Sequence, residues 1–281
     1  MTLKKTEKPN LLQLASSDLP FERITASMIK CYKTCPKLFF YQYVHSFRLP
    51  GKPIPLAFGN AFHEGVEAFY KGEDPVAKFK EHFVKDGIRD IHKPEILLKF
   101  TDNLNDGIAM MEYWRDNAKA IHAVNEMPIE GTSEVPFKIT WPYPVAGGIG
   151  ELPIPFTGRF DRLANVPTII EYKTSKKPYK QSDVDEADQA SIYNYSYYLL
   201  NKEWPTEFFY VVFIKGRKNN PIQVLKTTRT KKSITDTYNM VGDILTEIAA
   251  KGTKERNYKY GEGFMHSYCD CKLYEKALLL V

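Results

Sequence analysis

The stretch GRFDRLANVPTIIEYKTS, residues 158–175, reads as two β-strands joined by a short connection. Side chains two positions apart along a strand point to the same face, so Glu171 and Lys173 share one face, whereas Ile170 and Tyr172 point to the other. A carboxylate and an ammonium within an apolar strand are unfavourable unless they are paired or bound to a metal ion. The second strand therefore raises the question of what its two charges do.

The connection between the two strands adds a third charged residue to the predicted group. The sequence ANVP, residues 164–167, is typical of a hairpin connection, and Asp161 lies near the end of the strand that precedes it. Adjacent strands would bring Asp161, Glu171 and Lys173 together. A cross-strand or surface ion pair explains the segment equally well at this level, so both interpretations stay open.

Composition and charge set limits on the whole chain. It has 281 residues, of which 43% are hydrophobic, with 18 Tyr and 17 Phe, as expected of a packed globular protein. The net charge of +5 permits a phosphate-bearing partner without requiring one. No apolar run approaches the roughly 18 residues of a membrane span, and the polar N-terminus does not resemble a signal peptide. We therefore expect a cytoplasmic protein with no membrane partner.

The first half of the chain predicts helices. Residues 25–43 read as a helix interrupted at Pro36, and residues 57–124 read as mostly helical, with breaks at KGEDP (71–75) and IHKP (91–94). We predict four regions: a flexible N-terminal arm (1–24), a helical subdomain (25–131), a core (132–252) and a C-terminal tail (253–281).

The second half predicts a mixed sheet flanked by helices, and thus an α/β fold. A Gly-rich loop is expected at residues 144–153. Helices are expected at 182–201, capped by Ser182 or Asp183, and at 231–252. The predicted strands are residues 133–141, 153–164, 167–175, 206–216 and 221–230.

Two predicted helices carry polar residues spaced four apart. Gly59, His63 and Glu67 form one stripe, in which the glycine would permit close approach of another element and Glu67 would be a partner on the helix face. Gln189 and Tyr193 share a face of a later helix. Taken singly, each of these residues fits an ordinary structural role, and a lone histidine beside an apolar stripe is usually structural.

The order of these motifs is more specific than any one of them. A segment with a serine, a Cys-Pro pair and several aromatics, SMIKCYKTCPKLFFYQYV (27–44), precedes them, and the whole pattern spans about residues 25–215. This pattern resembles the RecB-family branch of the PD-(D/E)xK nuclease superfamily. The residues that carry the resemblance are Gly59, His63, Gly158, Asp161, Glu171, Lys173, Gln189 and Tyr193.

The resemblance implies a restriction-endonuclease-like fold and a metal-dependent catalytic site. One or two divalent cations would be held by His63, Asp161, Glu171 and the backbone carbonyl of Tyr172. Such donors suit Mg²⁺ or Mn²⁺, and the imidazole favours Mn²⁺. Lys173 would act with these ligands as a catalytic residue, adding positive charge near the nucleophile and the phosphate.

Further residues are predicted to contact the substrate. Gln189 and Tyr193 would position the nucleic acid strand, Tyr193 by stacking. Arg159 and Lys176 would contact phosphates, although Arg159 also fits pairing with a carboxylate. Lys176 belongs to a basic segment that, with residues 215–218, would form a rim for the DNA backbone.

Two residues near the predicted site leave alternatives. Glu134 begins a predicted strand where related proteins often carry a glutamate, so it either joins the acidic site or lies in solvent at the strand end. For Arg162 we favour pairing with a carboxylate over contact with a phosphate.

The resemblance implies a DNA exonuclease of phage or bacterial recombination or repair that leaves a 5′-phosphate. No G-x-x-x-x-G-K-[ST] motif accompanies it, so such an enzyme would act on ends or strands prepared by another protein. Three alternatives stay open: a CRISPR spacer-processing nuclease with an integrase partner, a non-catalytic DNA-binding protein, and a hydrolase of RNA or nucleotides. A homo-oligomer and a recombination-protein partner also stay open.

The cysteines form two clusters near opposite ends of the chain. Many members of this branch hold an iron–sulfur cluster with one N-terminal and three C-terminal cysteines. Cys35, Cys269 and Cys271 match three of these positions, but the expected late cysteine is missing, and Cys31 or His266 would have to replace it. A [4Fe–4S] cluster, a zinc site and buried free thiols therefore all stay open.

Overall fold

The structure of the protein is a computed structural model. It describes residues 14–145, 148–217, 219–262, 266 and 269–279. Among these residues, no helix combines the length and the apolar composition needed to cross a membrane.

The chain divides into two compact units, each of which is assembled from separate segments. Unit 1 comprises Met1–Arg48, Phe137–Gly158 and Thr230–Val281. Unit 2 comprises Leu49–Pro136 and Arg159–Arg229. All the predicted catalytic and substrate-binding residues belong to unit 2, and all four cysteines belong to unit 1. The predicted four-region division of the chain stays a prediction.

A five-stranded mixed sheet is the centre of the fold, with strand order β1-β4-β5-β6-β7. Strand β5 pairs antiparallel with β4 and parallel with β6, and β7 is antiparallel to β6. The sheet confirms the predicted α/β fold and all five predicted strand segments. Its strands are β1 (Gly131–Ile139), β4 (Phe156–Ala164), β5 (Thr168–Ser175), β6 (Glu207–Ile214) and β7 (Ile222–Thr227).

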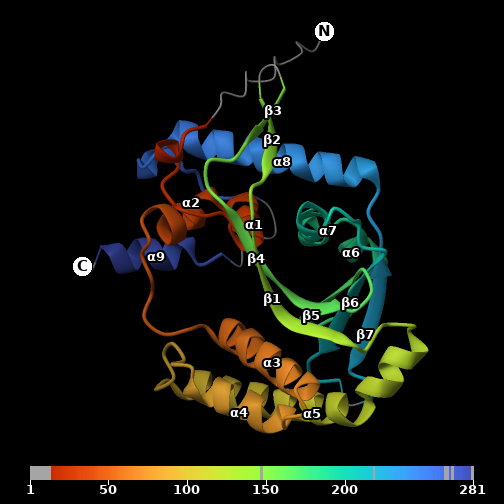
Figure 1. The fold of residues 1–281 in the computed structure, drawn as a ribbon. Coiled ribbons are helices and arrows are strands. Elements are labelled where there is room, and N and C mark those ends of the chain that lie inside the picture. The colour runs from red at the N-terminus through yellow and green to blue at the C-terminus, as the bar shows by residue number, and fades with distance from the viewer. Residues whose placement is uncertain (1–13, 146–147, 218, 263–265, 267–268, 280–281) are drawn as a thin grey trace, which may run out of the picture. The chain divides into compact units, whose positions relative to one another are not determined.

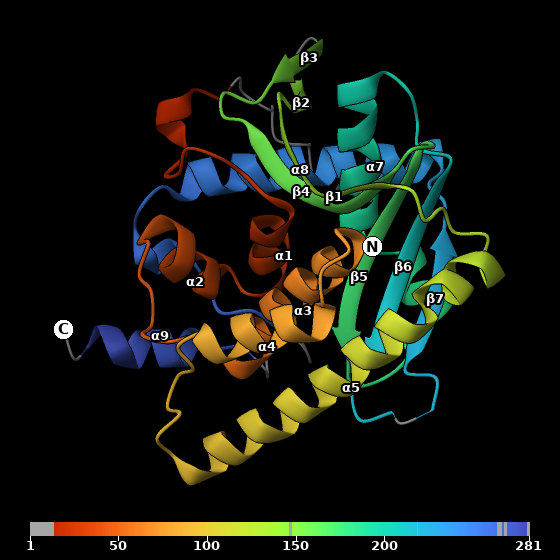
Figure 2. The same cartoon turned by 60° about the horizontal axis from the view of Figure 1, so that its bottom comes forward.

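Three helices of unit 2 cover one face of the sheet: α3 (Ile54–Tyr70), α4 (Pro75–Lys85) and α5 (Pro94–Val124). Figures 1 and 2 show them on one side of β5 to β7. Ile170 and Tyr172 of β5 join the same buried cluster as the helices' aromatic side chains. The predicted breaks are confirmed, since α4 and α5 both begin at a proline, which suits the first position of a helix.

Unit 2 has two further helices, α6 (Gln181–Asp185) and α7 (Asp188–Asn201), where one helix was predicted. Arg229 donates to the carbonyls of Val184 and Ala187 at 2.8 and 3.0 Å, which satisfies backbone groups at the break. Ser182 and Asp183 consequently lie inside α6 instead of capping a long helix.

Unit 1 contains the predicted N-terminal helical segment. Its first helix, α1 (Ala26–Thr34), is capped by Thr25, and Pro36 starts the next. A hairpin of β2 (Pro142–Val145) and β3 (Gly148–Glu151) occupies the segment predicted as a Gly-rich loop, so that prediction was wrong. The remaining elements are η1 (Ser16–Asp18), α2 (Pro36–Phe39), the π-helical η2 (Phe40–Val44), α8 (Lys231–Lys251), η3 (Glu255–Asn257) and α9 (Cys271–Leu278).

Candidate active site

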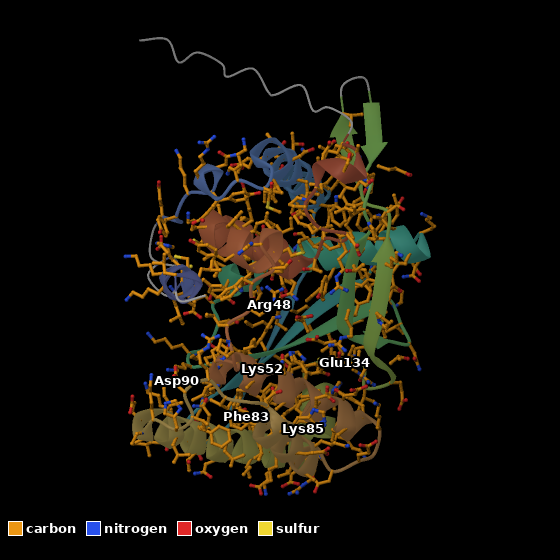
Figure 3. The ribbon with its side chains drawn as sticks, turned by 90° about the vertical axis from the view of Figure 1, so that its left-hand side faces the viewer. Arg48, Lys52, Phe83, Lys85, Asp90 and Glu134 are labelled. Carbon is orange, nitrogen blue, oxygen red and sulfur yellow. The ribbon has the colours of Figure 1, made fainter. Side chains whose placement is uncertain are left out.

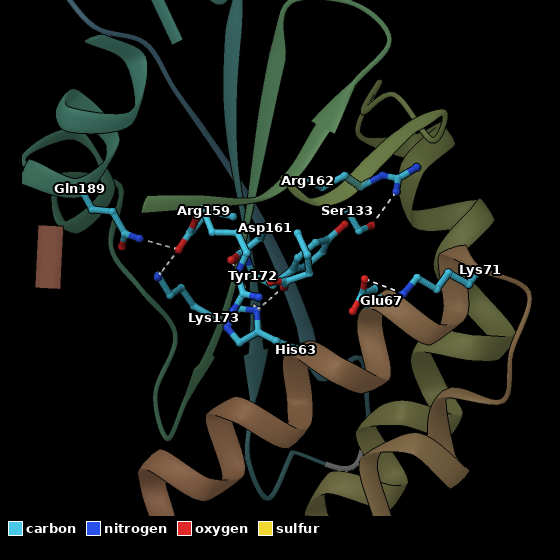
Figure 4. A network of polar contacts seen from close by, with 12 residues as sticks. His63, Glu67, Lys71, Ser133, Arg159, Asp161, Arg162, Tyr172, Lys173 and Gln189 are labelled. Carbon is cyan, nitrogen blue, oxygen red and sulfur yellow. Dashed lines mark hydrogen bonds and ion pairs between the residues drawn. The ribbon is translucent and has the colours of Figure 1, made fainter. Parts of the chain in front are cut away.

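Strand β5 presents its two charges on the face opposite the helical cluster. Glu171 is 2% exposed and forms an ion pair with Lys173, while Tyr172 between them is buried in the cluster of α3 to α5. The alternation predicted from the sequence is therefore confirmed. Figure 4 shows Lys173 and, below it, His63 on α3.

Asp161 of β4 is fixed next to β5 by a backbone hydrogen bond. The amide N–H of Tyr172 donates to Asp161 Oδ2 at 2.8 Å. In the antiparallel pairing of the two strands, Arg162, the neighbour of Asp161, lies opposite Ile170. Asp161 thus lies close enough to Glu171 and Lys173 to influence their pKa values, as the predicted hairpin required.

His63 on α3 completes an acidic group with residues of two strands. Its Nδ1 lies 3.5 Å from Asp161 Oδ1 and 3.9 Å from Glu134 Oε1. The ligating atoms of His63, Glu134 and Asp161 all lie within 4.8 Å of one another. Of the two environments considered for Glu134, the structure places it in the site: its side chain is only 13% exposed.

The backbone of Glu134 has an unusual conformation for a strand. Its φ is +54°, in the left-handed region that non-glycine residues seldom adopt. Such conformations carry strain and concentrate at functional sites. Figure 3 shows Glu134 on the sheet and Phe83 among the helices of unit 2. The sequence does not predict this conformation, because glutamate is not a residue that favours a positive φ.

Burial shifts the pKa of every acidic residue in this group upward. Loss of hydration raises the pKa of Asp161 to about 6 and the pKa of Glu134 and Glu171 to about 7, and in the two glutamates the charge of Asp161 adds to the effect. Burial lowers the pKa of His63 to about 4, so its imidazole is neutral at physiological pH. A bound cation would offset this effect by favouring the charged carboxylates.

The pKa of Lys173 is set by its neighbours more than by burial. Burial by itself lowers its pKa, but the carboxylates of Glu171 and Asp161 outweigh that effect and raise it. Lys173 consequently remains an ammonium.

One buried oxygen of Glu171 is available to bind a cation. Glu171 Oε1 accepts hydrogen bonds from Lys173 and from Gln189, but Glu171 Oε2 is buried without a hydrogen-bond partner among the described residues. Buried polar atoms are rarely left unpaired. The converging group has the imidazole of His63 and the carboxylates of Glu134 and Asp161, and these donor types, with Glu171 as a further carboxylate, fit Mg²⁺ or Mn²⁺.

Gln189 and Tyr193 reach the site from α7, where Gln189 is partly exposed and Tyr193 is buried. Gln189 Nε2 donates to Glu171 Oε1 at 2.7 Å. Tyr193 is 8% exposed and packs edge-on against Phe160, with ring centroids 5.3 Å apart. Their predicted contacts with substrate stay predictions, while the structure shows Gln189 holding a carboxylate.

The basic residues differ in their surroundings. Arg159 pairs with Glu134, with Nε and Oε2 2.5 Å apart. Arg162 forms no ion pair with a carboxylate among the described residues, contrary to expectation: it is buried, donates to Ser133 Oγ at 2.9 Å and lies 3.5 Å from the centre of the Tyr70 ring. Lys176 is exposed at the end of the β5 region, and residue 218 of the predicted basic rim lies outside the described residues.

The two motif glycines have different environments. A Cβ on Gly158 would lie 2.3 Å from the ring of Phe137, so this position requires glycine. A Cβ on Gly59 would meet no described atom within 4 Å, so among the described residues no other element makes the close approach that this glycine would permit. Glu67 pairs with Lys71 along the helix at 2.7 Å, as expected for a residue on the helix face.

The cysteines lie apart from this group in the sequence and belong to unit 1. Cys35, Cys269 and Cys271 gather with His266. The Cys31 thiol instead lies 3.9 Å from Gln42 Oε1.

Comparison with known proteins agrees with the fold. Residues 23–272 match the family model of the PD-(D/E)XK nuclease superfamily. The chain belongs to this superfamily, which confirms the resemblance and the fold expected from the sequence.

A solved structure has the same fold. The crystal structure of a candidate exonuclease from Eubacterium rectale has a TM-score of 0.54 and 13% sequence identity, with 92% of each chain covered. The crystal structure of the protein SSO0001 is less similar, with a TM-score of 0.36, 13% identity and coverage of 80% of this chain and 75% of that chain. None of the curated proteins matches the sequence.

Proposed function

We propose that this protein is a divalent-metal-dependent DNA nuclease that hydrolyses phosphodiester bonds. The observation that carries the proposal is the buried Glu171 carboxylate, which has one unpartnered oxygen and lies beside Asp161, His63 and the ammonium of Lys173. Membership of the nuclease superfamily supports the same chemistry.

Each residue has a role that follows from its position. His63, Glu134, Asp161 and Glu171 would hold the cation. A bound Mg²⁺ or Mn²⁺ lowers the pKa of a coordinated water and neutralises charge on the phosphate oxygens. Lys173 contributes a fixed positive charge where negative charge builds up during attack on phosphorus.

The surrounding residues orient this group. Gln189 fixes one oxygen of Glu171, which leaves the other directed to the cation. Arg159 holds Glu134 and, with the exposed Lys176, supplies positive charge for the phosphates of the strand. Cleavage of the bond to the leaving 3′-oxygen would leave a 5′-phosphate on the released product.

We further propose an exonuclease that acts in phage or bacterial DNA recombination or repair. The order of the sequence motifs supports this role, and the Eubacterium rectale protein with the same fold is itself a candidate exonuclease. Dependence on a free DNA end is the property that separates this role from endonuclease activity.

The test compares end-labelled linear DNA with covalently closed circles, in single- and double-stranded form, with Mn²⁺, Mg²⁺ or EDTA. We expect hydrolysis of linear DNA with either metal, none in EDTA, and none of the circles. Lys173→Ala is expected to lower kcat about a hundredfold or more, because it removes charge stabilisation of the transition state.

Lys119→Ala serves as the matched control, since Lys119 is an exposed lysine on α5 that belongs to none of the predicted motifs. Its activity should stay close to that of the parent. Cleavage of circles would replace the exonuclease assignment with an endonuclease, and DNA binding without hydrolysis under any metal would overturn the nuclease proposal.

A further inference from the structure

A second group of potential metal ligands lies in unit 1 and shares no residue with the proposed catalytic site. It consists of Cys35, His266, Cys269 and Cys271, whose ligating atoms all lie within 4.8 Å of one another. Cys35 and Cys271 are almost completely buried, at 0% and 1% exposure. Three thiols and one imidazole thus converge from segments more than 230 residues apart in the sequence.

Backbone amides are directed at the sulfurs of this group. The N–H groups of Leu38 and Gly261 each donate to Cys35 Sγ at 3.4 Å, and the N–H of Cys271 donates to Cys269 Sγ at 3.4 Å. His266 Nε2 lies 3.3 Å from Cys271 Sγ. Hydrogen bonds of this kind favour the charged thiolate form, which is the form that binds metal ions.

The C-terminal segment is pressed closely against the segment that carries Cys35. A Cβ at Gly261 would lie 2.1 Å from the carbonyl oxygen of Thr34, so only glycine fits there. The amide of Lys37 donates to the carbonyl of Lys259 at 2.9 Å. These contacts hold the two segments in register, and the four ligands are brought together by the fold of unit 1 itself.

The spacing of the four donors distinguishes a single ion from a cluster. A tetrahedral zinc ion with Zn–S bonds of about 2.3 Å holds its donors about 3.8 Å apart. A four-iron cluster is a larger body, with each cysteine bound to a different iron, so it holds the four cysteine sulfurs further apart. The observed upper limit of 4.8 Å fits the single ion.

The composition of the group points the same way. Cys31, the fourth cysteine available for a cluster, is not among the four converging donors, and its place is taken by a histidine. Three cysteines and one histidine are an established ligand set for structural zinc. The residues therefore do not fit the [4Fe–4S] cluster that the resemblance implied.

We propose that Cys35, His266, Cys269 and Cys271 bind one Zn²⁺ ion that joins the two ends of the chain within unit 1. Each thiol releases its proton to solvent as its sulfur coordinates, and His266 binds through a neutral nitrogen. All four positions of the ion are filled by protein, which makes the site structural rather than catalytic.

The experiment measures metal in the full chain, purified without added metal, by elemental analysis for zinc and iron and by assay of acid-labile sulfide. We expect about one zinc ion per chain and no stoichiometric amount of iron or sulfide. Replacement of the metal by Co²⁺ should give the intense visible absorption of tetrahedral cobalt bound to thiolates. This spectrum is recorded on the unmutated chain, so it does not depend on whether any variant folds.

Two cysteine variants then test the ligand assignment. Cys271→Ser is expected to lose the zinc and lower the midpoint of thermal unfolding, whereas the control Cys31→Ser should keep both unchanged. Any of three results would overturn the proposal. The first is iron and sulfide in equal amounts with a broad visible absorption, and the second is zinc that is lost only in Cys31→Ser. The third is a chain that holds neither zinc nor iron and gives no cobalt–thiolate spectrum.

Discussion

Glu134 combines two unfavourable features in one residue. Its backbone is in the left-handed region, with φ +54°, and its carboxylate is largely buried beside Asp161. Neither feature helps the metal-free protein, whereas both direct an oxygen toward His63 and Asp161. At the scale of single residues, such a combination of backbone strain and a buried charge is typical of functional sites, which agrees with the proposed role of Glu134 as a metal ligand.

The raised pKa of Glu134 predicts a specific dependence of stability on pH. Below the ordinary glutamate pKa, both the folded and the unfolded states carry the proton. Between that value and about 7, the folded state holds a proton that the unfolded state has lost, so raising the pH destabilises the fold. We expect the free energy of unfolding of the parent in EDTA, relative to Glu134→Gln, to fall by about 2 kcal/mol between about pH 5 and about pH 8.

Urea unfolding of the two proteins at both pH values measures this difference. Glu130→Gln, at an exposed glutamate on the same segment, is the control and should leave the pH dependence of the parent unchanged. If the free energies of unfolding of the parent and of Glu134→Gln differ by the same amount at both pH values, the predicted pH dependence is wrong.

Gln189 tests whether the α7 motif positions the catalytic group or binds the substrate. Because its amide donates to Glu171 Oε1, Gln189→Ala should lower kcat about tenfold and leave KM nearly unchanged. Steady-state kinetics on a labelled oligonucleotide measures both constants. A raised KM with an unchanged kcat would instead support the substrate contact that the sequence motif implied.

The sequence predicted side-chain positions correctly where the alternation along a strand alone decides which face a residue occupies. The period of two along a strand correctly assigned Glu171 and Lys173 to one face and Tyr172 to the core. It could not decide the position of Glu134 or the contacts of Arg162, because these depend on a local backbone distortion and on residues brought in by tertiary contacts.

At the scale of elements, the packing of α3, α4 and α5 depends on small residues at particular positions. A Cβ on Gly107 of α5 would lie 2.0 Å from the ring of Phe79, which is fully buried on α4. Gly59 of α3 is also within a helix but faces open space in the described part of the chain. The same substitution should therefore have opposite effects at the two positions.

Gly107→Ala is expected to destabilise the protein by about 1–3 kcal/mol, because a buried ring cannot move aside. Gly59→Ala is expected to stabilise it by about 0.5–1 kcal/mol, because alanine loses less backbone entropy than glycine in a helix. Denaturant unfolding of both variants checks the prediction. Stabilisation by both substitutions would mean that α4 and α5 are not packed as described.

Element boundaries were predictable where the chain carries a local signal. The prolines at residues 75 and 94 start helices, as their fixed backbone angle favours. The break between α6 and α7 has no such signal, since it is stabilised by Arg229, some 40 residues away. The β2–β3 hairpin was missed because its strands are short and lie in a segment rich in glycine.

At the scale of the whole molecule, the order of motifs along the chain carried more information than any element. His63, Asp161, Glu171 and Lys173 come from a helix and two strands, and the mixed sheet brings them together. The division into two units, each built from separated segments, could not be read from the sequence, because composition changes along the chain do not report which segments pack together.

The most direct test of the account is to count the Mn²⁺ ions bound by the chain, using the electron paramagnetic resonance signal of free Mn²⁺. The parent is compared with Asp161→Asn, whose amide oxygen can still accept the hydrogen bond from Tyr172, and with the exposed control Asp236→Asn. We predict that Asp161→Asn weakens Mn²⁺ binding about tenfold or more, whereas the control binds as the parent does. Equal binding by all three proteins would show that the buried carboxylates beside Lys173 are not a metal site.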